Sequence, residues 1–138
     1  MVGGHYTYAR MPWFDWLKDA AGWSRNYYDR VGHFMQGAVP AIVAREILLR
    51  TTPLKRGRML TTLVLSVCLA ISASYELIEF GVAKWTGSAA ADFLGTQGDP
   101  WDTQWDMFYC LVGAICSLAL VSRYHDRQMS SNRAGRYS

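Results

Sequence analysis

Residues 59–75 read MLTTLVLSVCLAISASY, an apolar run without a single charged side chain. The run continues to Ala83 and is interrupted only by Glu76 and Glu79. A second uncharged run, MFYCLVGAICSLALVS, covers residues 107–122. A transmembrane helix needs about 20 mainly apolar residues to cross a hydrocarbon core of about 30 Å, and both runs approach that length with their flanks. They predict two transmembrane helices; the alternative is a buried helical hairpin of a soluble bundle.

A third apolar segment, GHFMQGAVPAIVAREILLR at residues 32–50, is interrupted by Gly37, Pro40, Arg45 and Glu46. A helix of these 19 residues would extend roughly 28 Å, enough to span the membrane with a kink at Pro40. The segment could instead lie along the interface as an amphipathic helix. We favour spanning, which predicts an all-α integral membrane helical bundle of about three transmembrane helices.

Composition excludes several classes of protein. The 138 residues are 51% hydrophobic, 14% aromatic and only 18% charged, whereas about a quarter of an average soluble domain is charged. This balance argues against disorder and against a nucleic-acid partner, and membrane lipids are the expected partners. Three cysteines, Cys68, Cys110 and Cys116, lie in apolar runs without CxxC spacing and are most simply small core residues. The first residues contain no apolar core of a secretory signal.

The charges predict an orientation. Residues 50–58 carry four basic side chains and no acid, and residues 123–136 carry four arginines and one aspartate. Residues 84–106 carry one lysine against four aspartates. By the positive-inside rule, the basic ends and the C-terminus are cytoplasmic in a multi-pass protein of the bacterial inner (plasma) membrane. The expected organisation is a polar and aromatic N-terminal segment (1–30), a membrane helical bundle (31–123) and a basic cytoplasmic tail (124–138).

Polar residues collect at one predicted depth, near the outer leaflet. Glu76 and Glu79 lie roughly 25 to 30 Å along their helix from its basic end, and Asp102 and Asp106 open the returning helix at that level. Two stripes follow an i, i+3, i+7 pattern: Asp99, Asp102 and Asp106 ahead of Gly113, and Arg30, His33 and Gly37. Carboxylates in a membrane segment usually face the bundle interior or a wet cavity, and a glycine on such a stripe permits close helix approach.

Each of these groups also has a structural interpretation. Asp99 precedes a proline and is an ideal N-cap of the last helix, and Asp102 suits the positive end of its dipole. Either glutamate could form a structural ion pair with Arg30 or Lys84. His33 alone is more often a satisfied interfacial histidine than a ligand.

The strings YDRVGHFMQGAVPAIVAREILLR, SYELIEF, FLGTQGDPWDTQWDMFYCLVGA and SRYHDRQ closely resemble the YjdF-like bacterial inner-membrane proteins, and GGHYTYARMP resembles the segment that precedes them. The resemblance covers nearly the whole chain. Full-length members carry further apolar N-terminal helices, so we expect a truncated reading frame, a trimmed chain or a naturally short paralogue. Another copy of the chain or a partner would then supply the missing helices.

The family implies no established biochemical activity. It distantly resembles the VanZ-like membrane proteins, which are associated with glycopeptide tolerance and so suggest envelope lipids. In that pattern, a glutamate lies at the end of one helix, and an acidic stripe with a glycine opens the next. The comparable residues here are Glu76 or Glu79, Asp102, Asp106 and Gly113. The basic residue and the asparagine of the VanZ-like pattern are not matched.

Two classes of function remain open. The first is an enzyme that hydrolyses or transfers at an envelope lipid headgroup. Its catalytic candidates are Glu76, Glu79, Asp102 and Asp106, its substrate-binding candidates are Arg30 and His33, and its candidate ligands for a divalent metal are His33, Glu79, Asp102 and Asp106. The second is a non-enzymatic protein in which the same acids form a proton or cation relay or a polar structural core. A metal enzyme needs at least three convergent ligands, whereas a relay tolerates a linear chain.

Overall fold

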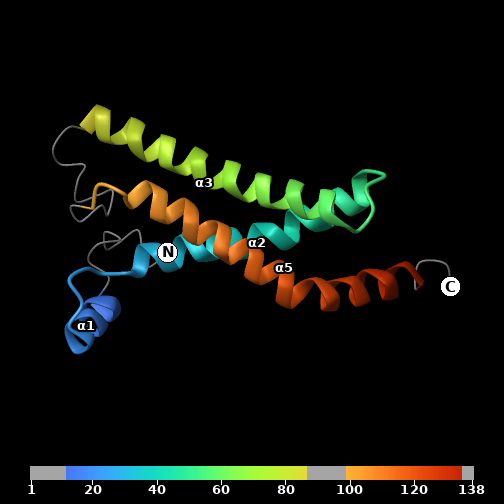
Figure 1. Cartoon of the computed structure of the whole chain (residues 1–138), viewed down its shortest axis with the longest axis horizontal. Coiled ribbons are helices and arrows are strands. Elements are labelled where there is room, and N and C mark those ends of the chain that lie inside the picture. Colours follow the sequence, from blue (N-terminus) through green and yellow to red (C-terminus); the bar gives the residue numbers. More distant parts are fainter. Residues whose placement is uncertain (1–11, 87–98, 135–138) are drawn as a thin grey trace.

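Helices account for all the regular secondary structure in the residues that the structure describes, 12–86 and 99–134 of this computed structural model. They are α1 (Pro12–Ala21), α2 (Tyr28–Thr51), α3 (Arg58–Thr86) and α5 (Asp102–Ala134). Figure 1 shows α2, α3 and α5 running along the long axis, with α1 set across the start of α2. The prediction of an all-α fold is confirmed. The first part of the predicted N-terminal segment, most of the acidic connection and the end of the basic tail lie outside the described residues.

The two uncharged runs form α3 and α5, as the sequence predicted. Spans of 28 and 27 residues, Arg58–Trp85 and Asp102–Gln128, are long and apolar enough to cross a membrane. In each, only 22% of the apolar window is buried, so most of its apolar side chains lie on the surface. A core helix of a soluble bundle would bury them, whereas a membrane helix exposes them to lipid. This favours membrane helices over the buried soluble hairpin.

The third predicted segment forms α2, which begins four residues earlier than expected and continues through Pro40. Its 24 residues extend about 36 Å. Its buried face repeats every fourth residue: Asp29, His33, Gly37, Ala41 and Arg45. Its exposed face repeats in the same way: Val31, Met35, Val39, Val43 and Ile47. An interfacial amphipathic helix exposes its polar face, and α2 has the opposite arrangement.

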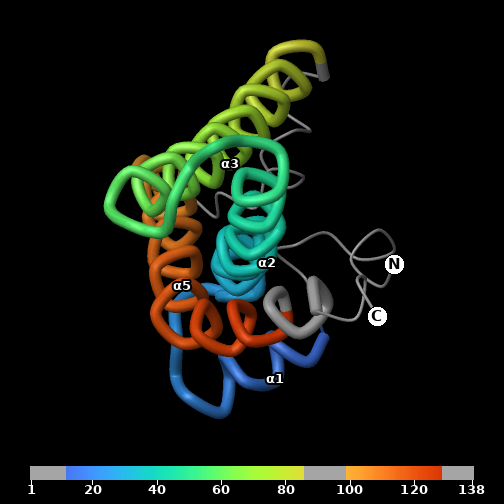
Figure 2. The backbone as a smooth tube through the Cα atoms, turned by 90° about the vertical axis from the view of Figure 1, so that its right-hand side faces the viewer, coloured from blue at the N-terminus to red at the C-terminus, as the bar shows by residue number. Residues whose placement is uncertain are grey.

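Two glycines form the closest contact of the bundle, where α2 crosses α5. A Cβ atom on Gly37 would overlap the backbone carbonyl of Cys110, and one on Gly113 would overlap the backbone carbonyl of Phe34. Small residues therefore let the two backbones touch, and α2 packs far more extensively on α5 than on α3. Figure 2 shows the bundle turned by 90°, and each of α2, α3 and α5 packs against the other two. Fully buried Cys68 and Cys110 fill the layer beside this crossing as free thiols.

The short helix α1 was not predicted, and none of its residues is buried. Two contacts connect it to the start of α2. The side-chain amide of Asn26 donates a hydrogen bond of 2.9 Å to Asp15 Oδ1, and the rings of Phe14 and Tyr28 meet edge to face at 5.3 Å. Because it has ten residues and no buried face, α1 depends on these contacts for its place.

Candidate functional site

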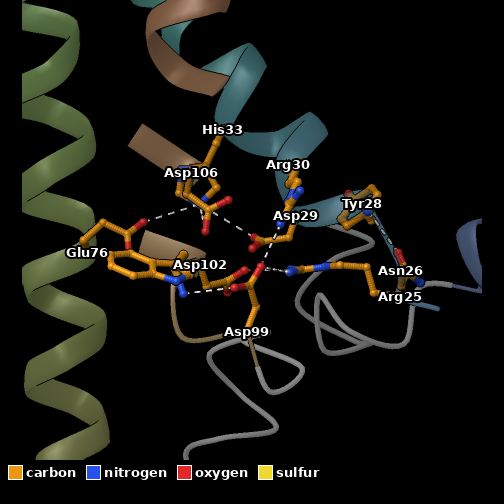
Figure 3. A network of polar contacts seen from close by, with 11 residues as sticks. Arg25, Asn26, Tyr28, Asp29, Arg30, His33, Glu76, Asp99, Asp102 and Asp106 are labelled. Carbon is orange, nitrogen blue, oxygen red and sulfur yellow. Dashed lines mark hydrogen bonds and ion pairs between the residues drawn. The ribbon is translucent and has the colours of Figure 1, made fainter. Parts of the chain in front are cut away.

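Three helices contribute polar side chains to one buried group at the end of the bundle where α2 begins. We call Asp29, His33, Glu76 and Asp106 the acidic cluster (Figure 3). One ligand atom from each of Asp29, His33 and Asp106 lies within 4.8 Å of the others. Glu76 reaches the group from α3, with Oε1 at 3.7 Å from His33 Nε2. All four side chains are at least nine-tenths buried.

The imidazole of His33 is oriented by Gln36, one turn further along α2. His33 Nδ1 lies 3.0 Å from Gln36 Oε1, and in the tautomer that donates this hydrogen bond Nδ1 carries the proton. In the neutral ring, Nε2 then holds a lone pair. This nitrogen lies 3.7 Å from Asp29 Oδ1 and 3.9 Å from Asp106 Oδ2, in addition to the glutamate. A lone pair facing three carboxylates requires a cation or a proton between them.

Two carboxylate oxygens of the cluster have no hydrogen-bond partner among the described residues. They are Glu76 Oε1 and Asp106 Oδ1. Buried polar atoms are nearly always satisfied, since an unsatisfied one costs about 1–3 kcal/mol and more if it is charged. The only basic group within ion-pair distance of these two acids in the described chain is His33. The cluster is therefore deficient in positive charge.

A second set of charges, beside the acidic cluster, is fully paired. Arg25 donates hydrogen bonds of 2.7 Å to Asp102 Oδ1 and 3.1 Å to Asp99 Oδ2. Arg30 donates one of 3.0 Å to the same oxygen of Asp99. Burial alone would lower the pKa of Arg25, but its hydrogen bond with Asp102 and the charges of the aspartates outweigh burial and raise this pKa above its ordinary value. Two guanidinium groups thus neutralise two carboxylates.

Aromatic rings enclose the guanidinium group of Arg30. Its central carbon lies 5.3 Å from the ring centroids of both Tyr27 and Trp105, and 5.6 Å from that of Tyr109. Cation–π contacts of this kind stabilise a guanidinium group by roughly 0.5–2 kcal/mol each. They hold Arg30 beside Asp99, with which it forms its hydrogen bond.

The candidates predicted from the sequence are divided between these two sets. The acidic cluster contains His33, Glu76 and Asp106, whereas Asp102 and Arg30 belong to the paired set. Glu79 is half-buried on the next turn of α3 and is outside the group with convergent ligand atoms. Among the described residues, neither glutamate has a salt bridge to Arg30 or Lys84.

The cap predicted at Asp99 is present, because its Oδ1 accepts a 2.9 Å hydrogen bond from the backbone N–H of Trp101. Sequence reasoning left three contributors out of the candidate sites: Arg25, Asp29 and Gln36. Asp29 had a usable signal, because it lies four residues before His33 and eight before Gly37 on one helix face.

A cavity of about 140 Å³ adjoins the acidic cluster. It is lined by Asp29, Gly32, His33, Gln36 and Tyr75. This volume exceeds the roughly 30 Å³ that one water molecule occupies in the liquid, so the cavity has room for water or a hydrated cation. Access to a polar cavity distinguishes this group from a sealed structural ion pair.

A second polar cluster lies toward the other end of α2. We call Arg45, Glu46, His125 and Asp126 the Arg45 cluster. Arg45 pairs with Asp126 Oδ1 at 2.7 Å and donates a 3.1 Å hydrogen bond to His125 Nδ1. His125 Nε2 lies 3.2 Å from Glu46 Oε2, and because Nδ1 accepts, Nε2 is the donor. Glu46 also pairs with Arg50 at 2.6 Å, the helix pair expected from the sequence, and Arg56 pairs with Asp126 at 3.2 Å.

Comparisons with known proteins address the class of the chain. The family model described as "Predicted membrane protein (DUF2238)" matches residues 1–127. The chain is similar to "Inner membrane protein YjdF" of Escherichia coli (strain K12), at 54% identity over 129 residues. The match covers 94% of this chain and 62% of that protein, so the chain spans less than two thirds of this curated relative. No solved structure gives a significant match.

Proposed function

We propose that the acidic cluster of this chain, which belongs to the DUF2238 family of predicted membrane proteins, binds a divalent cation and acts on the phosphate of a lipid headgroup. The resemblance to YjdF-like proteins predicted this family membership. Its inner-membrane localisation follows that of its relative. The observation that supports the proposal best is the position of His33 Nε2 among three carboxylates, two of which have an unpaired oxygen.

The proposed ligands are His33, Asp29 and Asp106, with Glu76 as the fourth. Carboxylates favour Mg²⁺, Ca²⁺ and Mn²⁺, and imidazole favours Zn²⁺ and other later transition metals, so this mixed set suits Mn²⁺ or Zn²⁺. Gln36 has the part of an outer-shell partner, because its hydrogen bond to Nδ1 orients the imidazole and directs Nε2 toward the acids.

A divalent cation at this position would polarise a phosphate oxygen and supply an activated water. The residues of the chain would do the remaining work. The acidic cluster would hold the cation, and Arg25 and Arg30 would neutralise Asp102 and Asp99 so that these acids do not compete for it. We propose for Arg30 a positioning role beside the site, in place of the direct phosphate contact expected from the sequence.

The alternative function, a relay that moves protons or cations across the membrane, has less support. A relay needs polar groups at short intervals. Between the acidic cluster and the Arg45 cluster, the described chain buries two polar side chains, Ser72 and Ser117, among Ala41, Val64, Cys68, Cys110 and Ala114. A local site at one end of the bundle fits this distribution better.

The proposal places this site near the outer face of the membrane. Asp29 and Arg45 are 16 residues apart on α2, roughly 24 Å along the helix, which is most of a hydrocarbon core of about 30 Å. With the basic end and the C-terminus cytoplasmic, as the positive-inside rule predicts, the acidic cluster lies toward the outside. A second copy or a partner that supplies additional helices also remains a prediction, as does the resemblance to VanZ-like proteins.

The test is Mn²⁺ binding to the purified protein in detergent, followed by electron paramagnetic resonance, with metal content of the protein as isolated. We expect one bound cation per chain, and Asp106→Asn should weaken its binding at least about 100-fold, since it removes a ligand from a site where lost outer-shell partners already cost 10- to 100-fold. Asp126→Asn, the matched change in the Arg45 cluster, should leave the affinity within about threefold. Equal affinities in the two variants would refute the cation site.

The proposed chemistry has its own test. Vesicles of phosphatidylglycerol or phosphatidic acid are incubated with the protein and Mn²⁺, and released headgroup or phosphate is measured. Release should require Mn²⁺, disappear in Asp106→Asn and persist in Asp126→Asn. A protein that binds Mn²⁺ tightly but gives no release above the Asp106→Asn background from either lipid would contradict the hydrolytic function and leave a binding site.

A further inference from the structure

An apolar groove along α3, to which α2 contributes Gln36, adjoins the cavity beside the acidic cluster. The groove has a volume of about 380 Å³, and its lining includes Gln36, Val67, Ile71, Ser74 and Tyr75. Gln36 and Tyr75 also line the cavity beside the acidic cluster. A molecule in the groove would therefore have one end against apolar side chains and the other end beside Asp29 and His33.

The groove opens on the lipid-facing surface of the bundle. Val67 is 38% exposed, Ile71 39% and Ile78 64%, and all three line the groove. In a membrane, these side chains face hydrocarbon rather than water. At the polar end, Gly32 lines the cavity, and a Cβ atom placed there would meet nothing within 4 Å. The cavity is thus open at Gly32 on its α2 side.

We propose that this groove holds one acyl chain of an anionic phospholipid that enters sideways from the bilayer between α2 and α3, with the lipid phosphate at the acidic cluster. The inference rests on the proposed function and adds the class of substrate and its route. The proposed cation supports this occupant, because a divalent ion bound by the acidic cluster can take a phosphate oxygen as a further ligand. Shape supports it as well, because the apolar part continues directly from the polar part.

The other sides of the bundle fit such a lipid less well. Between α2 and α5 the backbones touch at Gly37 and Gly113, which leaves no passage at that crossing. A second apolar pocket of about 380 Å³, lined in part by Trp23, Tyr27 and Phe34, shares no lining residue with the polar cavity. Its charged residue, Arg30, is already bound by Asp99.

The experiment uses phosphatidylglycerol with a diazirine in the middle of one acyl chain, diluted into phosphatidylcholine nanodiscs that contain the full chain and Mn²⁺. After photolysis, labelled peptides are identified by mass spectrometry. We expect the α3 peptide with residues 67–78 to be labelled several-fold more than the peptide that contains Leu120, which is 79% exposed to lipid but lies outside the groove. Dodecyl phosphate should displace this labelling, and inorganic phosphate at the same concentration should not.

Two variants block the groove. Ser74→Trp or, if it does not fold, Ala70→Phe should lower the labelling of the α3 peptide at least about fivefold, while Leu77→Trp, on an exposed position outside the groove, should leave it unchanged. All folded variants should retain wild-type Mn²⁺ affinity, so this measurement separates the two proposals. Absence of Mn²⁺ binding to the unaltered chain refutes the proposed function.

With Mn²⁺ binding intact, three results would each overturn the lipid route. The first is labelling that Ser74→Trp and Ala70→Phe do not reduce. The second is labelling that concentrates around Trp23 and Tyr27 of the second pocket. The third is equal displacement by inorganic phosphate, which would identify a site for free phosphate.

Discussion

The two polar clusters of this bundle have similar residue types and opposite charge balances. In the Arg45 cluster, each carboxylate has a guanidinium partner, Arg50 for Glu46 and Arg45 for Asp126. In the acidic cluster, three carboxylates share one imidazole within ion-pair distance among the described residues. Buried charges are tolerated when they are paired, so ion pairing accounts for the first cluster, and the proposed cation would supply the missing partner in the second.

The comparison separates stabilising charges from functional ones at equal burial. Arg45 is 5% exposed and Asp106 is 3% exposed, so exposure alone does not distinguish them. The number and kind of their ion-pair partners distinguish these two side chains. The following predictions test this difference, and each has an expected sign.

The largest effect on stability is expected at the contact of Gly37 with α5, because both clusters take side chains from α2 and α5. Gly37→Ala should destabilise the bundle by at least about 3 kcal/mol, the upper part of the range for overpacking, because the new Cβ overlaps a backbone carbonyl that cannot turn aside. Gly32→Ala, on the same helix but in open space, should change stability by less than about 1 kcal/mol. Unfolding in mixed detergent micelles measures both. Similar losses in the two variants would show that the close crossing is not required.

The next effect concerns the paired cluster. Arg45→Met should lower the free energy of unfolding by about 3 kcal/mol, at the low end for a broken buried ion pair, because it leaves Asp126 with only the exposed Arg56 and His125 without its donor. The double variant Arg45→Met, Asp126→Leu should recover part of this loss. If the single variant is as stable as the unaltered protein, the Arg45 cluster is not structural and the comparison fails.

At the acidic cluster a smaller change in stability is expected, and its sign is opposite to that at the Arg45 cluster. Without divalent cations, Asp106→Asn should leave stability unchanged or raise it by up to about 1 kcal/mol, since it removes an unpaired buried carboxylate. At Mn²⁺ concentrations 100 times the dissociation constant, the unaltered protein should gain about 2.7 kcal/mol and the variant none. Thermal unfolding with and without Mn²⁺ measures both. A loss of about 3 kcal/mol without Mn²⁺ would place Asp106 with the structural charges.

The smallest effect is expected at the exposed edge of the Arg45 cluster. Arg56 is 57% exposed at its side chain and pairs with Asp126 at 3.2 Å. Arg56→Ala should cost less than about 1 kcal/mol, the usual range for exposed pairs, and high salt should reduce the cost further. The same unfolding assay at two salt concentrations measures it. A cost equal to that of Arg45→Met would mean that exposure does not set the value of these pairs.

Apolar run length predicted α3 and α5, because a span of about 20 residues without charges has few alternatives to a membrane or a core helix. The segment that forms α2 was expected to be helical although Arg45 and Glu46 interrupt it. The helix ends were less accurate. The apolar run 107–122 ends well before α5, which continues to Ala134. Beyond the apolar run a helix is extended by local hydrogen bonds and propensity, which hydrophobicity does not report.

Depth along the helices predicted which carboxylates would meet, and His33, Glu76 and Asp106 do lie together. Spacing was less informative, because a face defined at three and seven residues assigned Arg30 to the stripe that Asp29 actually occupies. Both spacings fit one turn of an α-helix, and only packing against α5 decides between them. Arg25 lies before α2, where no helical period applies, so its pairing with Asp102 had no signal in the sequence.

The contact of Gly37 with α5 has a mechanical consequence. On the buried face of α2, Gly37 lies eight residues from Asp29 and eight from Arg45, about 12 Å along the axis in either direction. Two rigid helices whose closest contact is at one point rotate relative to each other about that point. A change in the crossing angle of α2 and α5 therefore opens or closes both ends together, by comparable distances. A movement that separates the two helices at Asp29 and Asp106 would thus also change their separation at Arg45 and His125. This coupling needs no chain of polar groups between the two ends.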